Sequence, residues 1–266
     1  MNVAATGQVN RSAADVYEEF FVPALFQEWA ARMAEAARLA PGQKVLDVAC
    51  GTGVLAREAA ARVAPDGAVT GLDRNDGMLA VARRKAPALE WRLARAESLP
   101  FADAAFDAVV CQFGLMFFED RVGALKEMWR VLRPGGRLAV AVWDALDNSP
   151  GYAAMVALLK RLFDDRAADA LRAPFVLGDA ERLRALFGEA GIAGIEVRTP
   201  AGTARFPSIE AWVHMDVKGW TLAELIDDAQ YQTLLKAAQR EFRAYVQRDG
   251  TVSFPAPAHI ATATKG

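Results

Sequence analysis

Apolar and polar positions along the chain predict helices and short strands in alternation. Between residues 12 and 39 apolar side chains recur every three or four positions, which indicates amphipathic helix with a break at Pro23. Farther along, short β-branched and apolar runs alternate with helical patterns; these runs cover residues 44–49, 67–73, 89–94, 106–112 and 137–143. Strands that alternate with helices predict a doubly wound α/β fold with a mostly parallel sheet.

The C-terminal part of the chain has a less regular pattern. Helix is expected over most of residues 209–246, and the last strand follows it. We therefore divide the chain into three expected parts: an N-terminal helical cap at 1–40, an α/β core at 41–206 and 248–266, and a helical insert at 207–247 that shapes an acceptor pocket.

Composition and charge narrow the class of protein. The 266 residues are 53% hydrophobic and 24% charged, which is ordinary for a globular protein. The chain has 31 Lys and Arg residues against 33 Asp and Glu residues, which gives a net charge of −2. Such a charge does not favour binding to nucleic acid or to anionic lipid. The sequence shows no membrane-inserting stretch and no secretory signal. Two cysteines in apolar stretches are typical of a reduced, cytoplasmic protein, and we expect no metal site.

The turn after the first predicted strand carries the clearest chemistry. Gly51 and Gly53 in CGTG leave room for a ligand close to the backbone and aim the amides of the next helix at a polar group. Asp73 ends the second strand, where a carboxylate can accept hydrogen bonds from two ribose hydroxyls. With Ala56, the two glycines also fit the G-x-G-x-x-A fingerprint of dinucleotide binding, so an NAD-dependent oxidoreductase stays open at this point.

Five segments in order resemble the class I S-adenosylmethionine-dependent methyltransferases, in the small-molecule branch that includes the ubiquinone and menaquinone biosynthesis C-methyltransferases. The matching segments are VLDVACGTG (45–53), GLDRNDGML (71–79), AESLPF (96–101), FDAVVCQFGLMFFED (106–120) and LRPGGRLAVAVW (132–143). The resemblance implies a Rossmann-like, mostly parallel seven-stranded sheet with N-terminal helices and a helical insert before the last strand. It also implies methyl transfer from S-adenosylmethionine to a small, partly hydrophobic metabolite by direct displacement.

The resemblance assigns cofactor contacts position by position. It places Asp73 at the ribose, Arg74 and Met78 around the adenine, and Gln112 beneath the methionine part. The expected contacts are Tyr17, Ala49, Cys50, Gly51, Gly53, Asp73, Arg74, Met78, Ala96, Glu97 and Gln112. Asp47 is expected to order the glycine loop or to meet the amino group of the cofactor. Arg95 stands where the family commonly has Asp, so recognition of the adenine amino group has to come from Glu97 or from backbone.

The sequence does not identify the methyl acceptor or the general base that would deprotonate it. His214, between Trp212 and Trp220 in the predicted insert, is the candidate catalytic base, although a surface or core position is the commoner role of such a histidine. We expect a monomer or homodimer. Two alternatives remain beside the methyltransferase: the NAD-dependent oxidoreductase and a noncatalytic subunit that binds S-adenosylmethionine.

Overall fold

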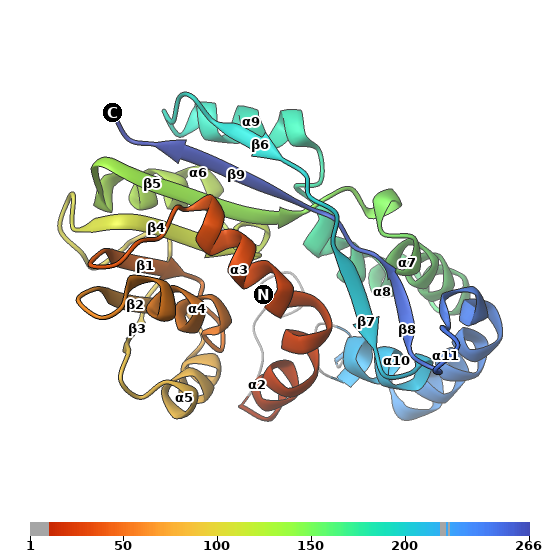
Figure 1. Cartoon of the computed structure of the whole chain (residues 1–266). Coiled ribbons are helices and arrows are strands. Elements are labelled where there is room, and N and C mark those ends of the chain that lie inside the picture. The colour runs from red at the N-terminus through yellow and green to blue at the C-terminus, as the bar shows by residue number, and fades with distance from the viewer. Residues whose placement is uncertain (1–10, 219–221, 223) are drawn as a thin grey trace.

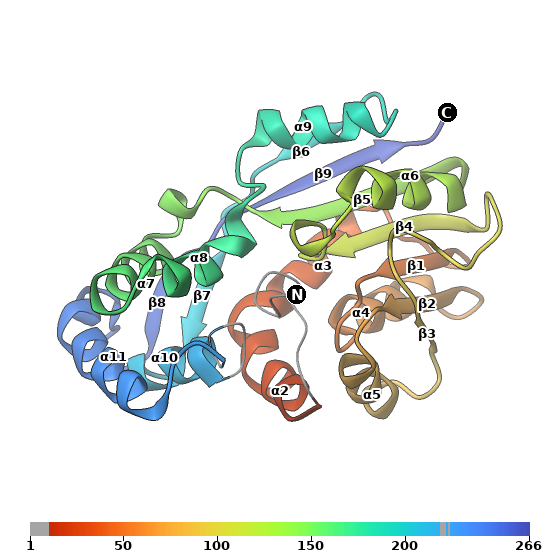
Figure 2. The same ribbon diagram turned by 180° about the vertical axis from the view of Figure 1, so that it is seen from behind.

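A computed structural model describes residues 11–218, 222 and 224–266 of the chain. The N-terminal residues on which the expectation of no secretory signal depends are outside the described part of the chain. Trp220, which the sequence places near the candidate base, is outside it too. Figures 1 and 2 show one large twisted sheet with helices on both faces and a second group of helices beyond one end of the strands. The expected α/β architecture is confirmed.

The main sheet has seven strands in the order β3-β2-β1-β4-β5-β9-β6. Its strands are β1 (Lys44–Val48), β2 (Ala68–Asp73), β3 (Glu90–Leu93), β4 (Phe106–Gln112), β5 (Leu132–Trp143), β6 (Glu196–Arg198) and β9 (Ala258–Thr264). Strands β1 to β5 run parallel to one another, and β9 runs antiparallel to its neighbours β5 and β6. Strand β4 is buried over nearly its whole length, as expected for a central strand covered on both faces.

Helices cover the two faces of this sheet. The helices of the cap and core are α2 (Arg11–Val16), α3 (Gln27–Ala36), α4 (Val54–Val63), α5 (Asp76–Lys85), α6 (Arg121–Val131) and α9 (Ala180–Glu189). Helices α3 and α4 lie on one face, and α6 and α9 lie on the other (Figures 1 and 2). Asn75 caps the start of helix α5, because its side chain accepts a hydrogen bond from the amide of Met78 at 3.2 Å.

The expected helix break at Pro23 is wrong. The helical segment η1 (Tyr17–Phe26) is a π-helix that joins α2 to α3 without interruption and contains Pro23. Proline lacks an N–H and cannot donate a helical hydrogen bond, so a locally wider helix accommodates it without ending the element. The uninterrupted helix places the aromatic residues of η1 beside the end of the sheet.

A smaller unit lies beyond the carboxyl ends of the parallel strands. Strands β7 (Thr203–Phe206) and β8 (Val252–Pro255) form a separate two-stranded antiparallel sheet. The helices near it are α7 (Pro150–Leu162), α8 (Asp165–Arg172), α10 (Ile209–Lys218) and α11 (Asp228–Glu241). Since α7 contacts both β8 and α11, this unit includes more of the chain than the expected insert at 207–247.

Within the part of the chain that the structure describes, every helix is too short or too polar to cross a bilayer.

Candidate functional site

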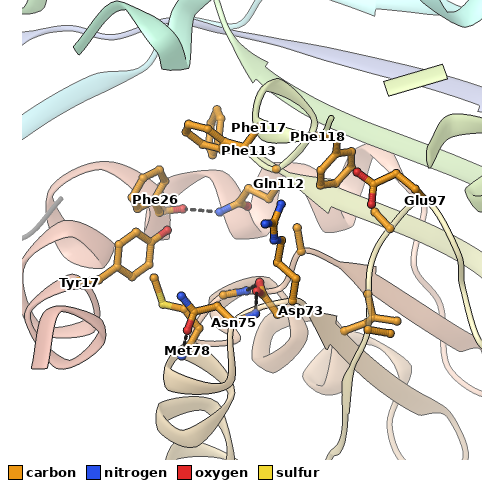
Figure 3. A pocket seen from close by; sticks show the side chains of 17 residues that line it. Tyr17, Phe26, Asp73, Asn75, Met78, Glu97, Gln112, Phe113, Phe117 and Phe118 are labelled. Carbon is orange, nitrogen blue, oxygen red and sulfur yellow. Dashed lines mark hydrogen bonds between the residues drawn. The ribbon is translucent and has the colours of Figure 1, made fainter. Parts of the chain in front are cut away.

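A cavity with an empty volume of about 840 Å³ opens where β1, β2 and β4 end. This position is the usual ligand site of an open α/β sheet. Figure 3 shows Asp73 and Asn75 on one side and Phe113, Phe117 and Phe118 on the opposite side. The described lining consists of Tyr17, Phe26, Ala49, Gly51, Leu72, Asp73, Arg74, Asn75, Met78, Ala94, Ala96, Glu97, Gln112, Phe113, Gly114, Phe117 and Phe118.

Asp73 is held in place by backbone amides on both of its carboxylate oxygens. The amide of Gly51 donates to Oδ2 at 2.8 Å, and the amide of Asn75 donates to Oδ1 at 2.8 Å. Burial raises the pKa of Asp73, and these amide hydrogen bonds act in the opposite direction. One carboxylate therefore both fixes the glycine turn and presents its remaining lone pairs to hydroxyl donors in the cavity.

Asp47 is a buried carboxyl group directly behind the glycine turn. It is 1% exposed, and neither of its oxygens has a hydrogen-bond partner among the described residues. Burial, and next the charge of Asp73, raise its pKa well above the ordinary value. A buried acceptor without a partner is costly unless a donor arrives with a ligand. Two neighbouring carboxyl groups therefore suit a ligand with hydroxyl groups and a positive charge, which fits S-adenosylmethionine.

The far end of the cavity is bordered by a charge network. Arg95, at the position that departs from the family pattern, lies 3.4 Å from a Glu97 carboxylate oxygen and donates to Glu119 at 3.0 Å. Arg74 lies 3.5 Å from Glu119, and the Glu119 amide donates to Glu97 at 3.2 Å. Arg95 is thus absent from the described lining but pairs with Glu97, which does line the cavity.

Aromatic rings from η1 and from the turn after β4 cover the cavity. Tyr17 and Phe26 stack with their ring centroids 5.2 Å apart, and the Phe26 centroid lies 5.6 Å from that of Phe113. The side-chain amide of Gln112 donates to the backbone carbonyl of Phe26 at 3.1 Å, as drawn in Figure 3. This bond ties the N-terminal helical segment to the end of β4, so the lid and the sheet form one enclosure.

Nine of the eleven expected cofactor residues line this cavity. They are Tyr17, Ala49, Gly51, Asp73, Arg74, Met78, Ala96, Glu97 and Gln112. Cys50 and Gly53 are absent from the described lining. Cys50 is buried, and burial raises the pKa of its thiol well above the ordinary value. The N–H of Gly53 donates to the Cys50 carbonyl at 2.8 Å within the turn.

Gly53 serves packing in this structure. Its φ is +86°, which favours glycine, and a Cβ there would lie 2.4 Å from the indole ring of Trp91. The two glycines of the turn therefore act differently: Gly51 borders the cavity, whereas Gly53 lets β3 approach the turn through Trp91.

The two histidines lie away from this cavity. His214, the candidate base, is exposed on α10 and borders a surface groove with Phe20 and Tyr231, outside the described lining of the central cavity. The structure thus does not bring His214 to the expected catalytic position. His259 is buried in β9, with Nδ1 2.7 Å from the Thr199 hydroxyl and Nε2 3.0 Å from the Gly178 carbonyl. These contacts give His259 a structural setting.

Sequence reasoning missed several lining residues, chiefly aromatic ones. They are Phe26, Leu72, Asn75, Ala94, Phe113, Gly114, Phe117 and Phe118. Phe113, Gly114, Phe117 and Phe118 follow β4 directly, so their position at a strand end was an available signal. Phe26 is remote in sequence from the sheet, and only the tertiary path of η1 brings it here.

Comparison with known proteins matches the central part of this fold. Residues 46–140 match the family described as "Methyltransferase domain". The ubiquinone/menaquinone biosynthesis C-methyltransferase UbiE of Bordetella avium is 43% identical over 144 residues, which cover 52% of this chain and 56% of that protein. A demethylmenaquinone methyltransferase of Symbiobacterium thermophilum is 40% identical over 118 residues, or 42% of this chain and 47% of that one. The chain thus spans about half the length of these curated relatives.

Solved structures share the fold over more of the chain. A phosphoethanolamine N-methyltransferase 2 of Haemonchus contortus, in complex with S-adenosylhomocysteine, aligns with a TM-score of 0.61 at 18% identity. The alignment covers 96% of this chain and 57% of that one. At such identity the likeness concerns the fold. Together, the comparisons show that residues 46–140 are similar to a methyltransferase domain and that most of the chain shares the fold of a solved methyltransferase.

Proposed function

We propose that the protein transfers a methyl group from S-adenosylmethionine to a small, partly hydrophobic acceptor. The observation that carries this proposal is the buried pair Asp47 and Asp73 at the glycine turn, within the matched methyltransferase segment. Asp73 is already oriented by two amides, and Asp47 has neither oxygen partnered among the described residues. Such a pair suits the ribose hydroxyls and the amino group of one ligand.

Residues of the cavity lining, and Asp47 buried outside that lining, would bind different parts of the cofactor. Asp73 would accept from the ribose hydroxyls, and Glu97 with Met78 would border the adenine. Asp47 would accept from the amino group. S-adenosylmethionine supplies an electrophilic methyl group on a sulfonium when bound. The protein contributes alignment and exclusion of water, because the rings of Tyr17 and Phe26 close the cavity above the strand ends. A sulfonium beneath aromatic faces also gains cation–π attraction.

The acceptor class follows from the lining and from the relatives. Phe26, Phe113 and Phe117 make the β4 side of the cavity apolar and aromatic. Two relatives, each matched over about half of its own length, are named as a ubiquinone/menaquinone biosynthesis C-methyltransferase and a demethylmenaquinone methyltransferase. We therefore favour an aromatic or otherwise apolar metabolite over a nucleic acid. The NAD-dependent oxidoreductase is the weaker alternative, because the matched segment continues past the glycine turn to residue 140.

Calorimetric titration with S-adenosylmethionine, S-adenosylhomocysteine and NAD tests this proposal. We expect micromolar binding of both sulfur ligands and at least tenfold weaker binding by Asp73→Asn, because two hydrogen bonds to a carboxylate weaken. Asp66→Asn, an exposed aspartate in the turn before β2, is the matched control and should bind as the parent does. Binding of NAD alone would favour the oxidoreductase. Tight binding without transfer to any phenol, quinol or amine would favour the noncatalytic subunit.

A further inference from the structure

A second cavity shares Phe26 with the first. It has an empty volume of about 400 Å³, and Phe26 belongs to the lining of both cavities. Elements of three regions meet around it: Phe26 from η1, Trp143 from the end of β5, and Tyr152, Leu171 and Asp216 from the smaller unit. In Figures 1 and 2 the N-terminal helices lie between the sheet and this unit.

The lining of the second cavity is almost wholly apolar. Leu25, Trp143, Leu171, Pro174 and Phe175 supply aliphatic and aromatic surface. Tyr152 is buried there and packs edge to face against Phe254, with ring centroids 5.4 Å apart. An enclosed apolar space next to a cofactor cavity suits the apolar body of a small molecule better than water.

Asp216 is the exception to this apolar lining. The residue is only 3% exposed, and its Oδ2 has no hydrogen-bond partner within residues 11–218, 222 and 224–266. Burial raises its pKa well above the ordinary value, and the nearby Trp212 indole acts in the opposite direction. A buried carboxyl group with a free oxygen costs stability. That cost is offset when a ligand supplies the missing partner.

We propose that the second cavity holds the apolar body of the methyl acceptor and that Asp216 hydrogen-bonds a hydroxyl group of that acceptor. This inference rests on the proposed methyl transfer and specifies the substrate class of the same site. A neutral hydroxyl satisfies Asp216 without separating charge in an apolar space, whereas an ammonium group would require a buried ion pair and its desolvation. The acceptor then reaches past Phe26 toward the end of β4, where the first cavity begins.

Two small phenyl compounds test the hydroxyl contact; they differ in whether the ring oxygen carries a hydrogen or a methyl group. We would titrate 4-ethylphenol and 4-ethylanisole by saturation-transfer NMR, with S-adenosylhomocysteine present. The parent protein should bind the phenol about tenfold more tightly than the anisole, because only the phenol donates a hydrogen bond. Asp216→Ala should abolish that preference. Glu210→Ala, which removes an exposed carboxylate from the same helix, should retain it.

A second variant locates the bound phenol. Leu171→Phe adds volume to the cavity wall from α8 and should weaken binding of both compounds. Equal binding of phenol and anisole by the parent, or an unchanged preference in Asp216→Ala, would overturn the proposal. S-adenosylhomocysteine binding is measured separately by calorimetry. If S-adenosylhomocysteine binds but the phenol preference is absent, only the acceptor inference is contradicted. If S-adenosylhomocysteine does not bind, the proposed function is contradicted, and so is the acceptor role of this cavity.

Discussion

Asp73 has two features at the scale of a single residue: its carboxylate accepts a hydrogen bond from the amide of Gly51, and it lines the cavity. The motif predicted a ligand contact for Asp73, and its place at the cavity follows from a strand end and a fixed spacing. The contact itself stays a prediction. Gly53 belongs to the same motif, yet the space beside its Cα is occupied by the Trp91 ring. Motif spacing alone does not distinguish a glycine that borders a ligand cavity from one that makes room for an aromatic side chain.

Replacement of Gly53 should separate backbone strain from a steric clash. Gly53→Ala places a Cβ 2.4 Å from Trp91 at φ +86°, so we expect a loss of about 2–4 kcal/mol in the free energy of unfolding. Gly42 has φ +82°, and a Cβ there would meet no described atom within 4 Å, so Gly42→Ala should lose only about 1 kcal/mol. Urea denaturation of both variants measures the difference. Equal losses in the free energy of unfolding for the two variants would show that the Trp91 side chain moves aside at little cost.

The titration of Asp216 should appear in the pH dependence of stability. A carboxyl group whose pKa is raised on folding stabilises the protein fully below its unfolded pKa, about 4, and loses that contribution as pH rises through the folded pKa. Asp216→Asn removes the titration. Relative to the parent, its melting temperature should therefore rise as pH increases from 4, until the folded pKa is passed.

Thermal melts of parent and Asp216→Asn between pH 4 and pH 9 measure this effect. Among the cavity's lining residues, Tyr152 is the other titratable group, and burial raises its pKa well above its ordinary value, so it does not titrate over most of this range. A constant difference across the range would mean that Asp216 ionises in the folded protein as it does in water.

At the scale of elements, the N-terminal helical segment acts as the cover of the site. Pro23 predicted a break, but a π-helix carries the chain through it and delivers Tyr17 and Phe26 to the cavity. Local sequence rules describe α-helical geometry, so they could not predict this. The strand and helix pattern over residues 44–143 was predicted well, because buried parallel strands read as short apolar runs.

An ion pair fastens this cover to the core. Arg57 on α4 donates to Glu18 on η1 at 2.9 Å and to the Thr52 carbonyl at 2.7 Å. Arg57→Leu should raise the amide hydrogen-exchange rates of η1 about fivefold. The reason is that a partly buried ion pair of this kind adds about 1 kcal/mol to the free energy of local opening of that segment. Glu58→Leu is the control, because Glu58 lies on the same helix and accepts a hydrogen bond from Arg62 within it. Unchanged exchange in Arg57→Leu would mean that aromatic packing alone holds the cover.

At the scale of the molecule, the site depends on contacts between distant parts of the chain. Strands β7 and β8 pair although they are far apart in sequence, and the cavity lined by Asp216 draws on residues from 25 to 216. Sequence patterns predicted most of the cofactor side, which is built from consecutive strand ends. They did not predict the second cavity, because its walls meet only through tertiary packing.

The cavity at the ends of β1, β2 and β4 is the place where we expect S-adenosylmethionine to bind. A crystal structure of the protein with S-adenosylhomocysteine tests this most directly. We predict the ribose hydroxyls within hydrogen-bond distance of Asp73, the adenine beside Glu97 and Met78, and the amino group facing Asp47. Ligand density elsewhere on the protein, or an adenosine group bound away from Asp73, would contradict this prediction.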